Sequence, residues 1–241
     1  MSKRYGLCFW LLLSMSFEAR ATECVILLHG LARSSASMNT LERSLIADHY
    51  KVVNYDYPST QEEIAPLAND AIPSALEQCD KADSVHFITH SMGAILVRQF
   101  LHHKTIANLG HVIMLGPPNQ GSEVVDKLRD VPGFQALNGP AGLQLGTAQD
   151  SLPNRLGAVN YSVGVIAGNQ SINLVLSTLI PGPDDGKVAI EKTKVEGMSD
   201  HITLATSHPF MMKNEGVIEQ AKYFLRHGSF LHNEQAAPTT Q

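Results

Sequence analysis

Ser91 is the residue whose surroundings point most directly to chemistry. The apolar run 85–89 leads into it, and a helical pattern begins immediately afterwards at Met92. A serine in such a sharp strand-to-helix turn exposes its hydroxyl as a nucleophile, and the strained turn requires small residues at positions −2 and +2. Gly93 meets this requirement at +2, but Thr89 at −2 is larger than the glycine that the pattern favours. The alternative interpretation is a serine that caps an ordinary turn.

A serine nucleophile needs a general base, most often a histidine. His208 follows the expected last strand, 202–205, and directly precedes Pro209 and a closing helix. It would therefore lie at the same end of a sheet as Ser91. His201 lies at the start of that strand, which is the opposite end. We predict His208 as the base and keep His201 as the alternative.

The base in turn needs a carboxylate that fixes its tautomer. Residues 182–188 read Gly-Pro-Asp-Asp-Gly-Lys-Val, a turn in which both Asp184 and Asp185 qualify. An Asp-Gly pair is also favoured by turn geometry alone. The residues by themselves therefore leave the choice between the two aspartates open.

A second buried run, 25–28, ends in His29-Gly30, about 60 residues before the serine. Acyl transfer places negative charge on the carbonyl oxygen, and each backbone N–H aimed at that oxygen contributes about 3–4 kcal/mol. The candidate donors for this oxyanion hole are the amides of Leu31 and Met92. Met92 also opens a helix, whose dipole adds to the effect. We interpret His29 as a residue that holds the loop.

Short β-branched runs alternate with helical patterns between these residues. Strands that are apolar on both faces and alternate with helices predict an α/β fold, in which a mostly parallel sheet has helices on both faces. Functional groups gather at the carboxyl ends of the strands in such sheets. The expected strands are 25–28, 51–54, 85–89, 112–115, 163–167 and 202–205, and the expected helices are 38–49, 62–78, 92–102 and 211–226.

The helix expected over 62–78 carries two further local signals. Thr60 and Glu63 have the spacing of a capping box at its start. Pro66 and Pro73 lie inside the pattern, so we expect them to kink or shorten the helix.

Three other regions lack a regular pattern. The glycine- and proline-rich stretches 130–160 and 168–187 are expected to be long connections, the first of them forming a partial cap over the site. Residues 117–119, Pro-Pro-Asn, either wall the pocket or simply stiffen a turn. The polar segment 229–241 is expected to be a disordered tail.

Residues 1–21 have the three-part layout of a secretory signal peptide. Two basic residues precede an uncharged apolar run, 7–17, and Ala-Arg-Ala at 19–21 is a small-x-small cleavage pattern. The run is about half of the roughly 20 residues that a membrane-spanning helix needs. We therefore expect cleavage, a single domain over 22–228, and a secreted or periplasmic product with no stable membrane anchor. A retained anchor and a buried first helix are the alternatives.

The charge of the expected mature chain limits its partners. Removal of residues 1–21 takes away Lys3, Arg4, Arg20 and Glu18, which leaves 15 basic and 22 acidic side chains and a formal charge of −7. An acidic chain without a basic cluster argues against nucleic-acid binding and against electrostatic docking on anionic lipid. The spacing of the cysteines excludes a zinc ribbon and a redox Cys-x-x-Cys motif.

Taken together, these motifs resemble the lipase/esterase branch of the bacterial α/β-hydrolases, which is related to the triacylglycerol lipases. The order serine, aspartate, histidine is the order of that superfamily. The similarity spans about residues 24 to 226. The segments that carry it are 29–35, 54–59, 89–93, 116–122 and 181–186.

The resemblance implies a compact α/β-hydrolase fold that lacks the first two strands, so that the sheet starts at Val25. It favours Asp185 over Asp184, because related lipases have their acid directly before Gly-x-Val. It implies hydrolysis of a small-molecule or lipid ester through an acyl-enzyme on Ser91, Asp185 and His208, with no cofactor and no metal. An acyltransferase or thioesterase with the same triad is the alternative, followed by a non-catalytic binding protein.

The sheet order of the resembled fold also predicts a disulfide. It places the strands at 25–28 and 85–89 side by side, about 4.8 Å apart. Cys24 begins the first strand and Cys79 closes the helix that feeds the second, so both lie at the end opposite the active site. An oxidising compartment would allow the bond to form. Two buried thiols are the alternative.

Overall fold

The fold was analysed in a computed structural model that describes residues 22–232. The expected signal peptide, 1–21, and the last part of the expected tail, 233–241, lie outside these residues. No helix within 22–232 combines the length and apolar character needed to cross a membrane.

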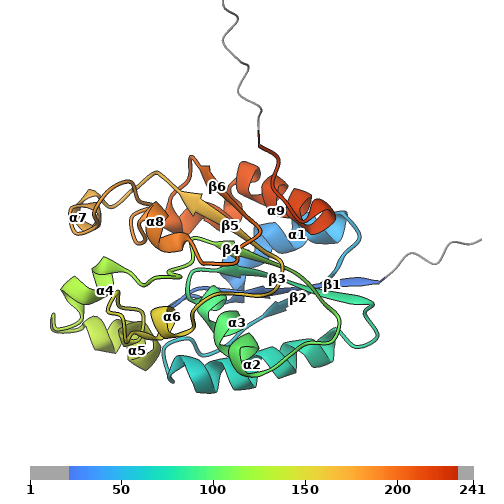
Figure 1. The fold of residues 1–241 in the computed structure, drawn as a ribbon, viewed down its shortest axis with the longest axis horizontal. Helices are drawn as coiled ribbons and strands as arrows, with labels where there is room; N and C mark the ends of the chain where they lie inside the picture. The colour runs from blue at the N-terminus through green and yellow to red at the C-terminus, as the bar shows by residue number, and fades with distance from the viewer. Residues whose placement is uncertain (1–21, 233–241) are drawn as a thin grey trace, which may run out of the picture.

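The centre of the molecule is one six-stranded sheet, visible in Figure 1 as the layer between the helices. All neighbouring strands pair in parallel. The order in the sheet is β2-β1-β3-β4-β5-β6, so the chain crosses over once after β2 and then proceeds in sequence. The strands are β1 (Glu23–Leu28), β2 (Lys51–Tyr55), β3 (Ser84–His90), β4 (Leu109–Leu115), β5 (Val163–Gly168) and β6 (Asp200–Leu204).

Four longer helices cover the two faces of the sheet, as the sequence predicts. They are α1 (Asn39–Ala47), α2 (Ile64–Gln78), α3 (Met92–His103) and α9 (Glu215–His227). Alternate residues of β1 face opposite layers: Ile26 packs with α2 and α3, whereas Leu27 packs with α1 and α9. Burial on both faces explains why the strand is apolar throughout.

Short helical segments fill the connections at the carboxyl edge of the sheet. Those after β4 and β5 project on one side of the molecule (Figure 1). They are η1 (Ser35–Met38), α4 (Glu123–Leu128), α5 (Phe134–Leu143), α6 (Leu152–Arg155), α7 (Leu174–Ser177), α8 (Ile190–Thr193) and η2 (His208–Lys213).

The predicted capping box before α2 is wrong. The helix begins at Ile64 with Glu63 as its N-cap, and no side chain of a neighbouring residue caps it. The Ile64 amide instead donates to Oε1 of Gln144, 80 residues away, at 2.8 Å. The helix also continues to Gln78 with Pro73 inside it, so the proline does not shorten it.

The closing helix starts later than predicted. Residues from His208 to Lys213 form η2, and α9 begins at Glu215, where the Asn214 side chain accepts a hydrogen bond from the amide of Val217 at 3.1 Å. An asparagine cap is a standard start signal, and it was overlooked in the sequence.

The chain remains packed beyond the expected domain end at Gly228. Phe230 is buried in the core, and its amide donates to Oδ2 of Asp200 at 2.7 Å. Leu231 and Gln220 exchange two hydrogen bonds. The first residues of the expected tail therefore belong to the domain.

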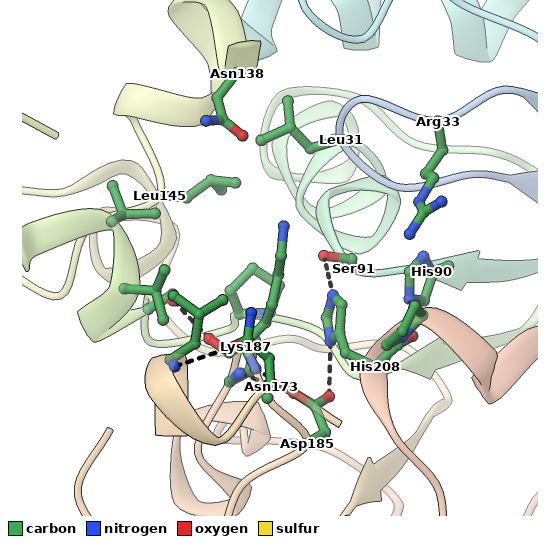
Figure 2. A pocket seen from close by; sticks show the side chains of 18 of the residues that line it. Leu31, Arg33, His90, Ser91, Asn138, Leu145, Asn173, Asp185, Lys187 and His208 are labelled. Carbon is green, nitrogen blue, oxygen red and sulfur yellow. Dashed lines mark hydrogen bonds and ion pairs between the residues drawn. The ribbon is translucent and has the colours of Figure 1, made fainter. Parts of the chain in front are cut away.

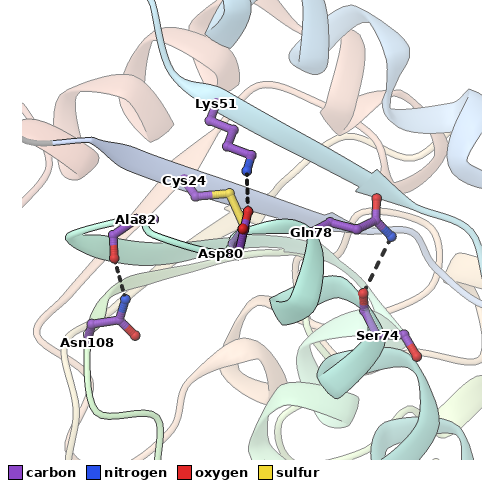
Figure 3. Close-up of a disulfide and its surroundings, with 8 residues drawn as sticks. Cys24, Lys51, Ser74, Gln78, Asp80, Ala82 and Asn108 are labelled. Atoms are coloured by element: carbon purple, nitrogen blue, oxygen red, sulfur yellow. Dashed lines mark hydrogen bonds and ion pairs between the residues drawn. A yellow bond between two sulfur atoms is a disulfide. The ribbon is translucent and has the colours of Figure 1, made fainter.

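The predicted disulfide is present. Cys24 and Cys79 are bonded, with their Cα atoms 5.8 Å apart, and β1 pairs with β3 as the resemblance implied. Figure 3 shows the bond at the amino-terminal edge of the sheet, beside the ion pair of Lys51 with Asp80. This edge is opposite the one where Ser91 lies.

Candidate active site

Ser91 has the backbone of a nucleophile turn. It separates β3 from α3 and has φ 52° and ψ −120°, a left-handed φ that a non-glycine residue rarely adopts. A Cβ atom at Gly93 would lie 2.6 Å from the carbonyl oxygen of Leu28, so only glycine fits at +2. The larger Thr89 is buried in the sheet, where its hydroxyl donates to the Ile113 carbonyl at 3.3 Å.

The structure brings together the three residues predicted to form a triad, although they are far apart in sequence. Nδ1 of His208 lies 2.7 Å from Oδ2 of Asp185, and Nε2 lies 3.0 Å from Oγ of Ser91 (Figure 2). A carboxylate can only accept, so the proton is on Nδ1 and Nε2 is free to accept from the serine hydroxyl. This is the tautomer that a general base requires.

The two aspartates of the acid turn have different partners. Oδ1 of Asp185 accepts from the amides of Lys187 and Val188 at 3.0 and 2.9 Å, which leaves Oδ2 for His208. Asp184 instead accepts from the Ser177 hydroxyl at 2.7 Å and ties α7 to the turn. The geometry therefore agrees with the choice of Asp185.

His201 lies at the opposite end of β6, away from Ser91. Its Nε2 donates to the hydroxyl of Thr193 at 3.0 Å, and that hydroxyl donates to the carbonyl of Ile190. Burial lowers the pKa of His201. It is a structural histidine in this position.

The loop after β1 is held by the loop after β2. The hydroxyl of Tyr57 donates to the carbonyl of His29 at 2.5 Å, and the two rings stack with centroids 4.2 Å apart. The amide of Ala32, at φ 52°, donates to the hydroxyl of Ser59 at 3.1 Å. These contacts agree with a structural role for His29. They fix the backbone on both sides of Leu31, one of the two predicted oxyanion donors.

The second predicted donor, Met92, is the first residue of α3. Its amide belongs to the first turn of the helix, where N–H groups have no acceptor within the helix. The positive end of the helix dipole lies at the same place. Leu31 lines the same pocket as Ser91, and Met92 directly follows Ser91 in the chain.

His90 is a site residue that the sequence reasoning missed. It is buried beside the base, with the two ring centroids 4.8 Å apart, and its Nε2 donates to the carbonyl of His208 at 3.0 Å. Burial lowers its pKa well below the usual range, so the ring is neutral. The contact joins residues 118 positions apart, so no local pattern predicts it. The one sequence signal for His90 is its position directly before Ser91.

A cavity of about 200 Å³ opens in front of Ser91. Phe134, Asn138 and Leu145 line it, so the stretch 130–160 does cover the site as expected. Ile172, Asn173 and Leu176, around the start of α7, form another part of the wall.

Residues 117–119 have divided roles. Pro118 lines the cavity, but Asn119 is buried behind it. The side chain of Asn119 donates to the carbonyl of Thr193 at 2.8 Å and accepts from Arg98 at 3.2 Å. Asn119 therefore stiffens the connection and does not reach the substrate space.

Comparison with known proteins places the chain in a family. The model of the alpha/beta hydrolase family matches residues 25–182, and the chain belongs to this family. This confirms the resemblance to the α/β-hydrolases drawn from the motifs. No curated protein sequence matches the chain.

Solved structures of bacterial lipolytic enzymes share the fold. The lipase BlEst2 of Bacillus licheniformis superimposes with a TM-score of 0.66 at 18% identity, covering 85% of this chain and 92% of its own. An esterase of Thermogutta terrifontis superimposes with a TM-score of 0.60 at 15% identity, covering 86% of this chain and 91% of the esterase. Phospholipase PlaB of Legionella pneumophila superimposes with a TM-score of 0.57 at 20% identity. The match covers 72% of this chain and 46% of PlaB.

Proposed function

We propose that this protein is a carboxylic ester hydrolase of the lipase/esterase type, with Ser91 as nucleophile, His208 as general base and Asp185 as the acid that orients it. The observation that carries the proposal is the continuous hydrogen-bonded chain from hydroxyl to imidazole to carboxylate, at 3.0 and 2.7 Å. The fold shared with a lipase, an esterase and a phospholipase supports the reaction class.

In the proposed reaction, Nε2 of His208 takes the proton of Ser91 as its oxygen attacks the ester carbonyl. The amides of Leu31 and Met92 stabilise the negative charge on the carbonyl oxygen. The protonated His208 then gives its proton to the leaving alcohol, and an acyl-enzyme remains on Ser91. Water, deprotonated by His208, hydrolyses this intermediate and releases the acid. No step requires a cofactor or a metal ion.

We further propose that the protein is exported to the periplasm or the medium, with residues 1–21 removed as a signal peptide. The disulfide between Cys24 and Cys79 supports this proposal, because such bonds persist in oxidising compartments. Intact-mass measurement of the exported protein tests it. A chain that starts at Thr22 is expected, and a mass that includes residues 1–21 would contradict it.

Hydrolysis of 4-nitrophenyl esters of two to twelve acyl carbons tests the reaction. The purified protein should release nitrophenol, and the dependence on chain length should reflect the cavity of about 200 Å³. Ser91→Ala should abolish the reaction, with a loss in kcat of about 10⁶-fold. Unchanged circular dichroism of the variant would exclude unfolding as the cause. Equal turnover by the variant and the wild type would refute the assignment of the nucleophile.

A further inference from the structure

Two cationic side chains, Arg33 and Lys187, line the cavity with Ser91, and both are exposed to solvent. Among residues 22–232, no ion pair or hydrogen bond engages the guanidinium of Arg33 or the ammonium of Lys187, whereas other lysines form ion pairs. Asp185 is the one acidic residue that lines the cavity, and its carboxylate is already engaged with His208. Two cations and one carboxylate therefore leave the cavity with a net positive charge.

This charge is unusual for the molecule as a whole. The chain has 18 basic and 23 acidic side chains, a formal charge of −5, yet two cations and only one carboxylate line the cavity. Desolvation and the charge of Arg33 lower the pKa of the Lys187 ammonium, whereas the charge of Asp185 raises it. A cavity with more positive than negative charge is complementary to a ligand that supplies an anion.

The two halves of an ester would face different walls of this cavity. The acyl half fits the apolar wall that includes Leu31, Phe134 and Leu145. The alcohol half must leave on the side of His208, which protonates the departing oxygen. Figure 2 shows Arg33 on that side, with Lys187 on the other side of Ser91. An anion on the alcohol half would therefore meet the guanidinium of Arg33.

We infer that Arg33 forms an anion subsite on the leaving-group side, that Lys187 adds positive charge from across the cavity, and that the preferred substrates are esters whose alcohol half carries a phosphate or a carboxylate. The inference rests on the proposed ester hydrolysis and narrows its substrate class. Arg33 presents several donors in a fork that matches either group, and Lys187 adds a point charge.

Matched aryl acetates test the subsite. 4-Acetoxybenzoate and 4-acetoxyphenyl phosphate carry the anion on the leaving group, and 4-acetoxybenzamide is their neutral counterpart. After correction for spontaneous hydrolysis, kcat/KM for the better anionic ester should exceed that for the amide by about tenfold or more, the value expected of a charge-assisted hydrogen bond. Arg33→Gln and Lys187→Gln should each reduce this ratio. The faster of the two anionic esters shows whether the natural substrate carries a phosphate or a carboxylate.

Arg43→Gln is the control, since it removes the same charge from an exposed residue of α1 outside the cavity, and it should leave the ratio unchanged. A neutral ester that reacts as well as both anionic ones, or a ratio unaffected by Arg33→Gln, would overturn the subsite while ester hydrolysis stands. Calorimetry of Ser91→Ala with 4-hydroxybenzoate and phenyl phosphate gives a readout without turnover. Binding of either anion that needs Arg33, in a protein that hydrolyses no ester, would support the subsite and contradict the proposed function.

Discussion

The sheet holds two serine–histidine pairs, one at each of its edges. At the carboxyl edge, Nε2 of His208 lies 3.0 Å from Oγ of Ser91. At the amino edge, Nδ1 of His111 on β4 lies even closer to a serine, 2.7 Å from Oγ of Ser162, directly before β5. Distance alone would therefore favour the wrong pair.

The surroundings of the two pairs differ in every other respect. His208 has a carboxylate 2.7 Å from its second nitrogen, whereas no carboxylate within residues 22–232 bonds to His111, on which Glu23 acts only from a distance. Ser91 has a strained φ of 52° and stands before a helix, but Ser162 precedes a strand and has no helix dipole beside it. A reactive serine thus requires the acid, the turn and the helix together, and a short contact with histidine is not sufficient.

Removal of the imidazole should give the largest difference between the two pairs. His208→Ala should lower kcat for 4-nitrophenyl acetate by about 10⁶-fold, because the members of a triad act as a unit. His111→Ala should keep the activity of the folded protein, since its serine has no role in the reaction. Steady-state kinetics of both variants measures the contrast. Equal losses would mean that the pair at the amino edge takes part in catalysis.

The choice of aspartate gives the next largest effect. Asp185→Asn should lower kcat by about 10⁴-fold, because an amide that donates to Nδ1 selects the wrong tautomer. Asp184→Asn should affect mainly stability, since Asp184 bonds Ser177 and the amide of Gly186. Rates and melting temperatures of both variants separate the two roles. A larger loss of kcat in Asp184→Asn would require a new assignment of the acid.

The amino edge should contribute stability without contributing to turnover. Replacing Cys24 and Cys79 together by alanine opens a link across a sequence separation of 55, which the chain-entropy model values at about 4 kcal/mol of unfolding free energy. Urea unfolding measures this loss. The kcat under native conditions should be retained, because the bond lies opposite Ser91. A variant as stable as the wild type would contradict the entropic argument.

A pH titration of stability probes the histidine pair at the amino edge. Burial lowers the pKa of His86, which packs against His111, to about 4, from an unfolded value near 6.5. As the pH falls, the unfolded chain therefore binds this proton before the folded protein does. The contribution of His86 to the free energy of unfolding is complete above about pH 6.5 and is lost as the pH falls toward 4. The loss for this residue is about 3 kcal/mol.

Chemical denaturation between pH 7 and pH 4 is the corresponding measurement. His86→Gln keeps an acceptor for the His111 amide and should show a shallower slope than the wild type. Other buried histidines with lowered pKa values, His29 and His90 among them, keep part of the slope in both proteins. Identical slopes would contradict the burial of a neutral His86.

The local sequence predicted the strands well, because burial on both faces of the sheet restricts their residues to apolar types. Each of the six strands was located within a few residues, because both faces of this sheet are covered and the strands are apolar throughout. The nucleophile turn was equally visible, since the backbone at Ser91 restricts its neighbours, as the close approach of Gly93 to Leu28 demonstrates.

Contacts between distant segments could not be predicted in the same way. Gln144 caps α2 in place of the expected Thr60, and no local pattern specifies a donor–acceptor pair 80 residues apart. The bond from His90 to the carbonyl of His208 depends on how two loops meet. Such interactions arise from the assembled fold, so they are visible only once it is known.

Covalent labelling tests the central claim most directly. A fluorophosphonate reacts only with a serine that is activated by its own base and oxyanion hole. After digestion and mass spectrometry of the labelled protein, the adduct should lie on Ser91, should be absent in His208→Ala, and should persist in Ser162→Ala. An adduct on Ser162, or no adduct on the folded wild-type protein, would contradict the account.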